Sequence, residues 1–330
     1  MRKVICAIVA LATVLAACSC GAQVPGEVQA VLNLTGSVDS LVEVGGTIYF
    51  VESGPNSEPH DATALRAFRP GHAPTTLGMV EIADAEVPCT APHLSSFHTS
   101  DADHFIATAD CSGRSFVVDV NVAGVRPQAR VVAPVPSSDY YAVWPADADK
   151  GWITRSEGLC QSIGSFSSAG IGGIGPIQPE FPWKIDAELR SSAIGTECDR
   201  SGEAWAVGAS ADGRRLYFMA APNSAGLAEP QRRNVEWSLY VLDAETHAVT
   251  TIADGFTKVV DADLSPDGSR VAVAATRTGT VGLWIVDTQS NAVRKVAPDH
   301  YLNTRFTHNG RIVASYLDGS RSSIVVADGG

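Results

Sequence analysis

The stretch ADLSPDGSRVAV, residues 262–273, determines how the rest of the chain is interpreted. It contains a short alternating run, an Asp-Gly pair and a second alternating run, which is the pattern of a β-hairpin with a tight turn. The same pattern occurs as VGASADGRRLYF at residues 207–218 and as TRFTHNGRIVA at residues 304–314. Because such self-similarity is typical of repeat architectures, each copy is predicted to belong to one structural unit that packs on the next.

Further predicted strands complete each unit. Short apolar runs at residues 239–243, 283–287 and 323–328 supply a third strand, and residues 249–253 and 293–297 supply a fourth. Four antiparallel strands in each unit, with the units stacked in chain order, form the blades of a β-propeller. The N-terminal half fits this frame less regularly. Across the whole chain, second strands are predicted to begin near Thr47, His104, Gly151, Arg214, Ser269 and Arg311. The sequence therefore predicts six units.

The two ends of the chain complement one another. The last unit stops after its third strand, and residues 28–34 (VQAVLNL) can supply the missing fourth. Closing the ring in this way leaves no exposed sheet edge. The sequence therefore predicts an all-β fold, a six-bladed β-propeller of four-stranded antiparallel blades whose N-terminal strand closes the last blade.

The stretch LSPDGSRVAV, residues 264–273, resembles the WD40-like repeats of TolB-type six-bladed propellers. The resemblance is fairly specific over residues 203–330 and looser over residues 36–200. It implies a periplasmic or surface scaffold with an open central channel. It implies no particular ligand, because one fold hosts many functions.

The N-terminal segment has the pattern of an export signal. Arg2 and Lys3 precede an apolar run at residues 4–17, which is too short to span a bilayer comfortably. The tetrapeptide LAAC at residues 15–18 resembles a bacterial lipobox, which implies a lipoprotein with a diacylglyceryl group on Cys18. Ordinary secretion with a chance cysteine is the alternative.

Three segments follow from this interpretation. We expect a signal peptide at residues 1–17, a lipidated tether at residues 18–27 and a single propeller domain at residues 28–330. The domain would lie outside the cytoplasm, anchored to the cell membrane by the lipid on Cys18.

Composition excludes several classes of protein. The formal net charge is −12 and only 18% of the residues are charged, so a nucleic-acid partner is not expected. No internal apolar run is long enough for a polytopic membrane protein.

Four cysteines lie in the body of the chain, Cys89, Cys111, Cys160 and Cys198. In an exported protein, scattered cysteines without a C-x-x-C pair indicate two disulfides, for which three pairings are possible. Their positions beside predicted strand ends favour Cys89–Cys111 and Cys160–Cys198. A zinc site is the weaker alternative, because the ligand spacing is wrong.

Loop lengths differ between the two ends of the predicted ring. Turns after first and third strands are short, whereas those after second and fourth strands hold insertions at residues 53–63, 176–203 and 222–236. We call the second end the long-loop face. Long polar loops on a rigid scaffold commonly carry binding sites, although drift in tolerant loops is the alternative.

Candidate binding residues on this face combine aromatic and charged side chains, which suits a peptide, a sugar or another protein. They are Asp39, His93, Tyr140, Trp183, Phe256, Asp261, Tyr301 and Arg305 near the channel mouth, with Arg232 and Arg233 in a long loop. Two alternatives remain open. The aromatic rings could pack between blades, and the arginine pair could be solvated.

No catalytic residue, metal ligand or cofactor is predicted. The string GIGGIG at residues 170–175 matches a dinucleotide motif, but Pro176 follows where a helix is needed. His93, His98 and His104 cannot all face one way along strands.

Two function classes remain. The favoured one is a binding or scaffold propeller for a protein or cell-envelope ligand. The alternative is a lactonase-like hydrolase with a calcium ion in the channel, which needs several converging oxygens. Asp39, Asp261 and Asn303 are the plausible contributors.

Overall fold

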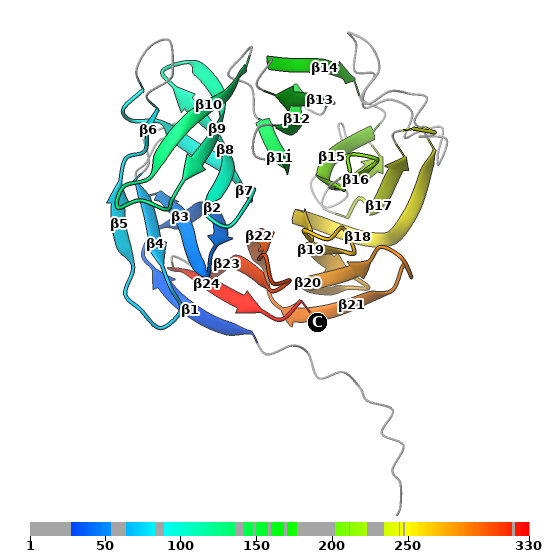
Figure 1. Ribbon diagram of the computed structural model, residues 1–330. Coiled ribbons are helices and arrows are strands. Elements are labelled where there is room, and N and C mark those ends of the chain that lie inside the picture. The colour runs from blue at the N-terminus through cyan, green and yellow to red at the C-terminus, as the bar shows by residue number, and fades with distance from the viewer. Residues whose placement is uncertain are drawn as a thin grey trace, which may run out of the picture.

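A ring of sheets, antiparallel except for the pairing of one short edge strand, forms the molecule, as the computed structural model shows (Figure 1). The structure describes residues 28–53, 64–82, 89–135, 141–147, 150–157, 160–167, 170–176, 202–210, 212–222, 234–243, 245–246, 248–318 and 321–329. The predicted signal peptide and tether, residues 1–27, lie outside this range. No helix in the described part of the chain is long and apolar enough to cross a membrane.

Three sheets occupy the N-terminal half of the ring. The first has the order β2-β3-β4-β5, with β2 (Ser37–Val44), β3 (Thr47–Ser53), β4 (Leu65–Phe68) and β5 (Thr75–Gly78). The second has the order β6-β10-β9-β8-β7, with β6 (Glu81–Ile82), β7 (His93–Thr99), β8 (His104–Cys111), β9 (Arg114–Asn121) and β10 (Gln128–Val135). The third has the order β11-β12-β13-β14, with β11 (Tyr141–Asp147), β12 (Lys150–Glu157), β13 (Cys160–Ser167) and β14 (Gly170–Pro176).

The C-terminal half begins with a seven-stranded sheet. Its strands are β15 (Gly202–Ala209), β16 (Arg215–Pro222), β17 (Trp237–Asp243), β18 (Val249–Leu264), β19 (Arg270–Arg277), β20 (Thr280–Asp287) and β21 (Val293–Pro298). Strand β18 has 16 residues, and its register with β19 shifts between Thr257 and Asp261. It therefore serves as the last strand of one meander and the first of the next. The count of six blades rests on this division of β18 and stays a prediction.

The last sheet joins the two ends of the chain. It has the order β1-β24-β23-β22, with β22 (Tyr301–Phe306), β23 (Ile312–Asp318), β24 (Arg321–Ala327) and β1 (Gln29–Leu34). Strand β1 pairs antiparallel with β24, from Gln29 opposite Val326 to Leu34 opposite Ser322. The predicted closure by the N-terminal strand is therefore confirmed.

The repeated hairpin is held by a hydrogen-bonded turn. In the copy at residues 262–273, Ser265 Oγ donates to Asp267 Oδ1 over 2.6 Å and accepts from the Arg270 amide over 2.9 Å. Gly268 has φ of 70°, a conformation that glycine adopts without steric cost. The same contacts recur over 2.6 and 2.9 Å at Ser210, Asp212 and Arg215. Local side chains thus determine the turn, which explains why the hairpins could be recognised from sequence.

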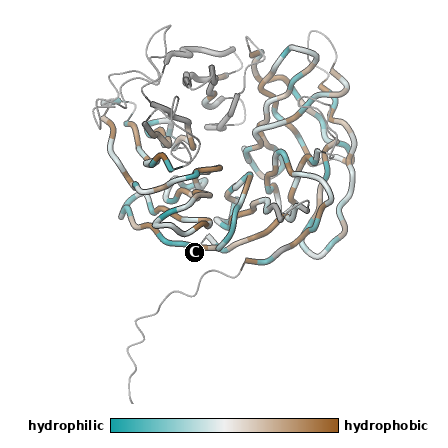
Figure 2. Tube along the Cα trace, turned by 180° about the vertical axis from the view of Figure 1, so that it is seen from behind, coloured by the Kyte–Doolittle hydropathy of each residue, from teal (hydrophilic) through white to brown (hydrophobic). Residues whose placement is uncertain are grey.

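Hydrophobic clusters fill the space between neighbouring sheets. One includes Tyr49 and Val51 of β3 with Phe105 and Val118 of β8 and β9. Another joins β19 and β20 to β22, β23 and β24. Hydrophobic residues recur along the strands around the described ring, as Figure 2 shows. Burial between sheets is what sets the position of the strands nearest the centre.

Candidate binding site at the propeller axis

The first strand of each meander lies nearest the centre of the ring, with β2, β7, β18 and β22 fully described there (Figure 1). We call these four the inner strands. Each contains a bulge against its neighbour in the same sheet, marked by a register shift. Three bulges contain a non-glycine residue with positive φ, namely Ser96 at 54°, Lys258 at 50° and Asn303 at 47°. Bulges redirect the side chains that follow them. After the bulges in β18 and β22, the redirected side chains contact a neighbouring inner strand.

Two carboxylates of β18 cap the edge of β22. Asp261 and Asp263 are two positions apart on the strand, so they lie on the same side. Asp261 Oδ2 accepts a hydrogen bond from the Thr304 amide, and Asp263 Oδ2 accepts one from the Phe306 amide over 2.7 Å. Among the described sheets, β22 is an edge strand that pairs only with β23, so its buried amides need such acceptors.

Arg305 connects these carboxylates to a third strand. Its Nη1 lies 2.9 Å from Asp261 Oδ2 and donates to the Thr304 carbonyl over 2.6 Å. Its Nε donates to the carbonyl of Phe97 on β7 over 3.2 Å. One guanidinium therefore links β22, β18 and β7 at the centre of the ring.

His98 of β7 completes the group, because its Nδ1 lies 3.7 Å from Asp263 Oδ1. We call His98, Asp261, Asp263 and Arg305 the axial network. Their side chains are 8–18% exposed. Burial raises the pKa of Asp263 to about 7, although Arg305 and the Phe306 amide oppose the rise. Burial, and then Arg305, lower the pKa of His98 well below 6.5, so the imidazole is neutral at neutral pH.

Burial also raises the pKa of Asp261, although Arg305 and the Thr304 amide favour its charged form. The network thus contains desolvated ionisable groups, two carboxyls whose pKa is raised and one imidazole whose pKa is lowered. Groups of this kind are commonly found at functional sites, although structural ion pairs produce the same shifts.

A second contact between inner strands uses only neutral groups. The Ser96 amide of β7 donates to Ser40 Oγ of β2 over 3.0 Å, and Thr99 Oγ1 donates to the Glu43 carbonyl over 2.8 Å. Asn303 Nδ2 of β22 donates to the Val38 carbonyl over 2.5 Å. Side chains therefore satisfy backbone groups of the inner strands on both sides of β2.

The structure brings together only some of the predicted binding residues. Asp261 and Arg305 form an ion pair. Asp39 instead accepts a hydrogen bond from Ser53 Oγ, next to it on β3. His93 begins β7, opposite Asp110 of β8.

Two of the four aromatic candidates, Phe256 and Tyr301, fall within the described residues, and both lie in the core. Phe256 is fully buried, with the Arg277 guanidinium 5.4 Å from its ring centroid. Tyr301 is 4% exposed, and its ring centroid lies 5.9 Å from that of Tyr316. Their burial favours the packing interpretation over a direct ligand contact.

The remaining candidates, Tyr140, Trp183, Arg232 and Arg233, lie outside the described residues. The same holds for most of the three long insertions that define the long-loop face, and for Cys18. Binding through that face stays a prediction.

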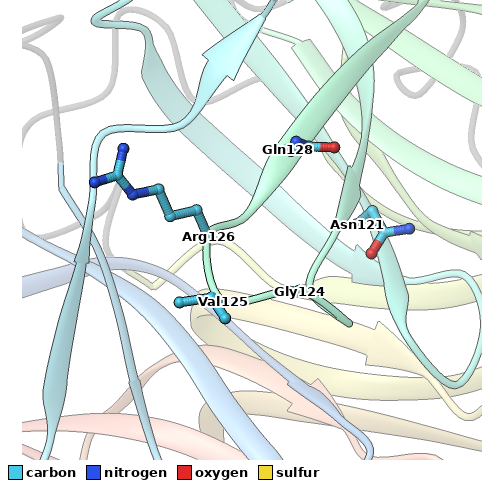
Figure 3. Close-up of a pocket in the computed structure, with 5 residues that line it drawn as sticks. All are labelled: Asn121, Gly124, Val125, Arg126 and Gln128. Atoms are coloured by element: carbon cyan, nitrogen blue, oxygen red, sulfur yellow. The ribbon is translucent and has the colours of Figure 1, made fainter.

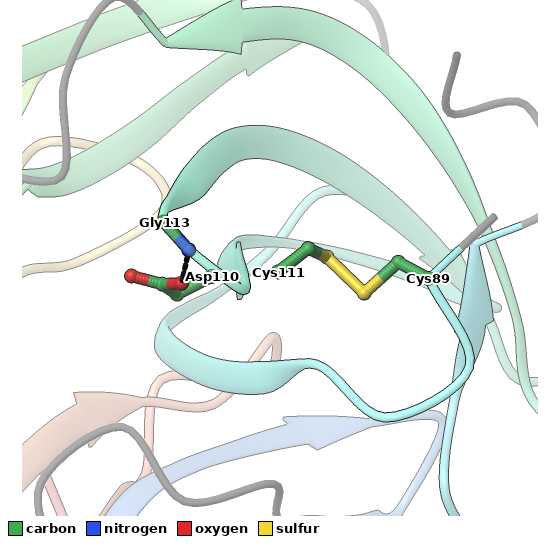
Figure 4. The surroundings of a disulfide bond; sticks show 4 residues. All are labelled: Cys89, Asp110, Cys111 and Gly113. Carbon is green, nitrogen blue, oxygen red and sulfur yellow. Dashed lines mark hydrogen bonds between the residues drawn. A yellow bond between two sulfur atoms is a disulfide. The ribbon is translucent and has the colours of Figure 1, made fainter. Parts of the chain in front are cut away.

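The disulfide between Cys89 and Cys111 is confirmed, with Cα atoms 5.8 Å apart (Figure 4). It ties the end of β8 to the segment that enters β7, and the Gly113 amide donates to Asp110 Oδ1 in the adjoining turn. The predicted Cys160–Cys198 bridge is not tested, because Cys198 lies outside the described residues.

The oxygens considered for calcium have separate partners. Asp39 pairs with Ser53, Asp261 with Arg305, and Asn303 with Val38. Within the described ranges, no group of three His, Cys, Asp or Glu side chains could hold a metal ion.

Sequence reasoning missed Asp263 and His98. Asp261 was among the predicted binding residues but Asp263 was not, and His98 was considered only in a group of histidines that cannot all face one way. Two acidic residues at alternate positions of an apolar inner strand are the signal that could have shown the pair, since they share one face.

Comparisons with known proteins identify the fold alone. No family model and no curated protein matches the chain. TolB from Acinetobacter baumannii is similar in structure, with a TM-score of 0.55, 15% identity, and coverage of 86% of this chain and 63% of that one. A putative TolB from Agrobacterium tumefaciens (TM-score 0.51, 13% identity, 90% and 92% covered) is also similar. So is an oligogalacturonate lyase in complex with manganese (TM-score 0.51, 12% identity, 93% and 94% covered).

These similarities show a TolB-like β-propeller fold. The chain spans about two thirds of the Acinetobacter protein, at 63% of its length. At such identities the similar structures include both TolB and an enzyme, so the fold does not decide between binding and catalysis.

Proposed function

We propose that the protein is an extracytoplasmic, lipid-anchored β-propeller that binds a protein or cell-envelope ligand through its long-loop face. The observation that carries the proposal is that the charged groups of the axial network contact neighbouring strands. Asp261 and Asp263 accept backbone amides of β22, and Arg305 contacts an Asp261 oxygen and two carbonyls. An active site instead needs reactive atoms that face a substrate.

Two features support the location. The lipobox-like LAAC at residues 15–18 predicts lipid on Cys18. The Cys89–Cys111 disulfide suits an oxidising compartment, because cytosolic thiols are kept reduced. A Cys18→Ser variant should therefore leave the membrane fraction, whereas Cys20→Ser should stay in it.

A propeller hydrolase is the second candidate. The raised pKa of Asp263 beside His98 favours it, since perturbed acids and bases suit proton transfer. Hydrolysis of a lactone panel by wild type, lost in both Asp263→Asn and His98→Gln, would replace the binding proposal by this one.

Capture of partners from cross-linked native membranes tests the binding proposal. The full-length protein should retain a reproducible protein or glycan that a variant with Arg232→Glu and Arg233→Glu loses. Arg214→Glu with Arg215→Glu is the matched control, because these two arginines are likewise adjacent in the sequence and lie, exposed, at the short-turn end. The control variant should retain the partner.

Two results would count against the proposal. Loss of the partner in both double variants would show a response to net charge rather than to the long-loop face. A partner retained by both would move the binding surface to another part of the molecule.

A further inference from the structure

A small cavity lies at the turn between β9 and β10, at the end of the ring opposite the long-loop face. Its volume is about 360 Å³, and its lining residues are Asn121, Gly124, Val125, Arg126 and Gln128 (Figure 3). This volume is within the usual range of small-ligand sites, roughly 300–1,000 Å³. No part of the proposed function uses it.

The cavity wall contains an arginine, Arg126, that has no counter-ion among the described residues. Arg126 and Gln128 are exposed, and neither side chain has a hydrogen bond or ion pair within the part of the chain described. Glu81 of β6 stands opposite Gln128 in the register of the sheet but does not line the cavity. On a chain with a formal charge of −12, a guanidinium that lies beside a cavity and pairs with no described residue favours an anionic group.

Asn121 is held in place by a chain of hydrogen bonds. Its Nδ2 lies 3.0 Å from His104 Nε2, and its Oδ1 accepts from the Ala123 amide over 2.9 Å. His104 Nδ1 lies 3.0 Å from Asp119 Oδ1, and Arg130 Nη2 donates to Asp119 Oδ2 over 3.3 Å. Because Nδ1 faces a carboxylate, it carries the proton, and Nε2 accepts from Asn121.

This chain fixes the orientation of the Asn121 amide. Asp119 is buried, with a side chain 5% exposed, and both His104 and Arg130 contact its carboxyl group. One hydrogen of the Asn121 amide remains for a ligand. Val125 is 97% exposed at the tip of the turn and offers an apolar contact.

We propose that this cavity binds the C-terminal carboxylate of a peptide chain. Arg126 binds the carboxylate, the amides of Asn121 and Gln128 bind the terminal peptide group, and Val125 contacts an apolar side chain. A cation, two amides and one aliphatic group match the groups at the end of a peptide.

Isothermal titration of the full-length protein with two probes tests this. N-acetyl-Ala-Val with a free carboxylate should bind with a roughly millimolar Kd, as expected for so small a ligand. Its C-terminal amide, which differs only at the carboxylate, should bind about ten-fold more weakly. Arg126→Gln should reduce binding of the acid to that of the amide, and Gln128→Ala should weaken it less.

Arg214→Gln is the matched control, because Arg214 is exposed and the change in net charge is the same. It should leave binding unchanged. Equal binding of acid and amide, or no binding of the acid, would overturn the proposal. Glucuronate that binds as tightly as the peptide acid would also overturn it, since the site would then recognise a sugar acid.

Discussion

The contact of β18 with β22 and the contact of β2 with β7 satisfy the same need by different chemistry. In both, side chains of one inner strand accept the amides of the next. The first uses the buried carboxylates of Asp261 and Asp263, with Arg305 as counter-ion. The second uses the Ser40 hydroxyl as acceptor of the Ser96 amide, and the Thr99 hydroxyl donates in the other direction to the Glu43 backbone carbonyl. Charged acceptors make the first contact dependent on pH and on one arginine, whereas the neutral contact should depend on neither.

The largest effect is expected from Arg305→Met. Removing the guanidinium leaves Asp261 and Asp263 partly buried without a counter-ion, which typically destabilises by about 3–5 kcal/mol. The free energy of unfolding in urea measures the change. Arg311→Met is the control, because the Arg311–Asp328 pair is largely exposed and should contribute less than about 1 kcal/mol. Equal losses in both variants would remove the distinction between the two contacts.

Asp263→Asn tests the pH dependence of the charged contact. Because the folded-state pKa is raised from 3.8 to about 7, the Asp263 carboxyl stabilises the fold at low pH, and that contribution is lost as pH rises toward 7. Asn keeps an acceptor for the Phe306 amide but does not titrate. The variant should therefore gain stability relative to wild type between pH 5 and pH 8, by roughly 2–3 kcal/mol.

His98 acts in the opposite sense. Its lowered pKa means that stability is lost as pH falls below 6.5, so over the pH range that the two groups share, its effect opposes that of Asp263. Thermal unfolding at several pH values for wild type, Asp263→Asn and His98→Gln separates the two groups. A constant difference between wild type and Asp263→Asn across this range would show that Asp263 does not titrate as described.

Ser40→Ala tests the neutral contact. The Ser96 amide would lose its acceptor in a buried setting, which costs about 1–2 kcal/mol. The loss should be the same at pH 5 and pH 8, because no titratable group takes part. Denaturant unfolding at both values checks this, and a loss that changes with pH would connect Ser40 to the axial network.

The sequence predicted those features that local chemistry determines. The Ser-x-Asp-Gly turns depend on a few neighbouring residues. The closing strand and the Cys89–Cys111 bridge each depend on a single pair of strands or strand ends. The axial network could not be placed, because a bulge changes which face a residue occupies. Asp261 follows the shift in β18 and Arg305 follows the shift in β22, so period-two alternation alone did not show that they meet.

The smallest effect is expected at the β18 bulge itself. Lys258 has φ of 50°, which is unfavourable for a residue with a Cβ atom, and its side chain is exposed. Lys258→Gly removes that strain but increases the freedom of the unfolded chain, so the net change should be within about 1 kcal/mol. Lys258→Ala keeps the strain without the charge and is the control. If the bulge only positions Asp261 and Asp263, both variants keep the pH dependence of wild type, because the carboxylates that titrate remain in place.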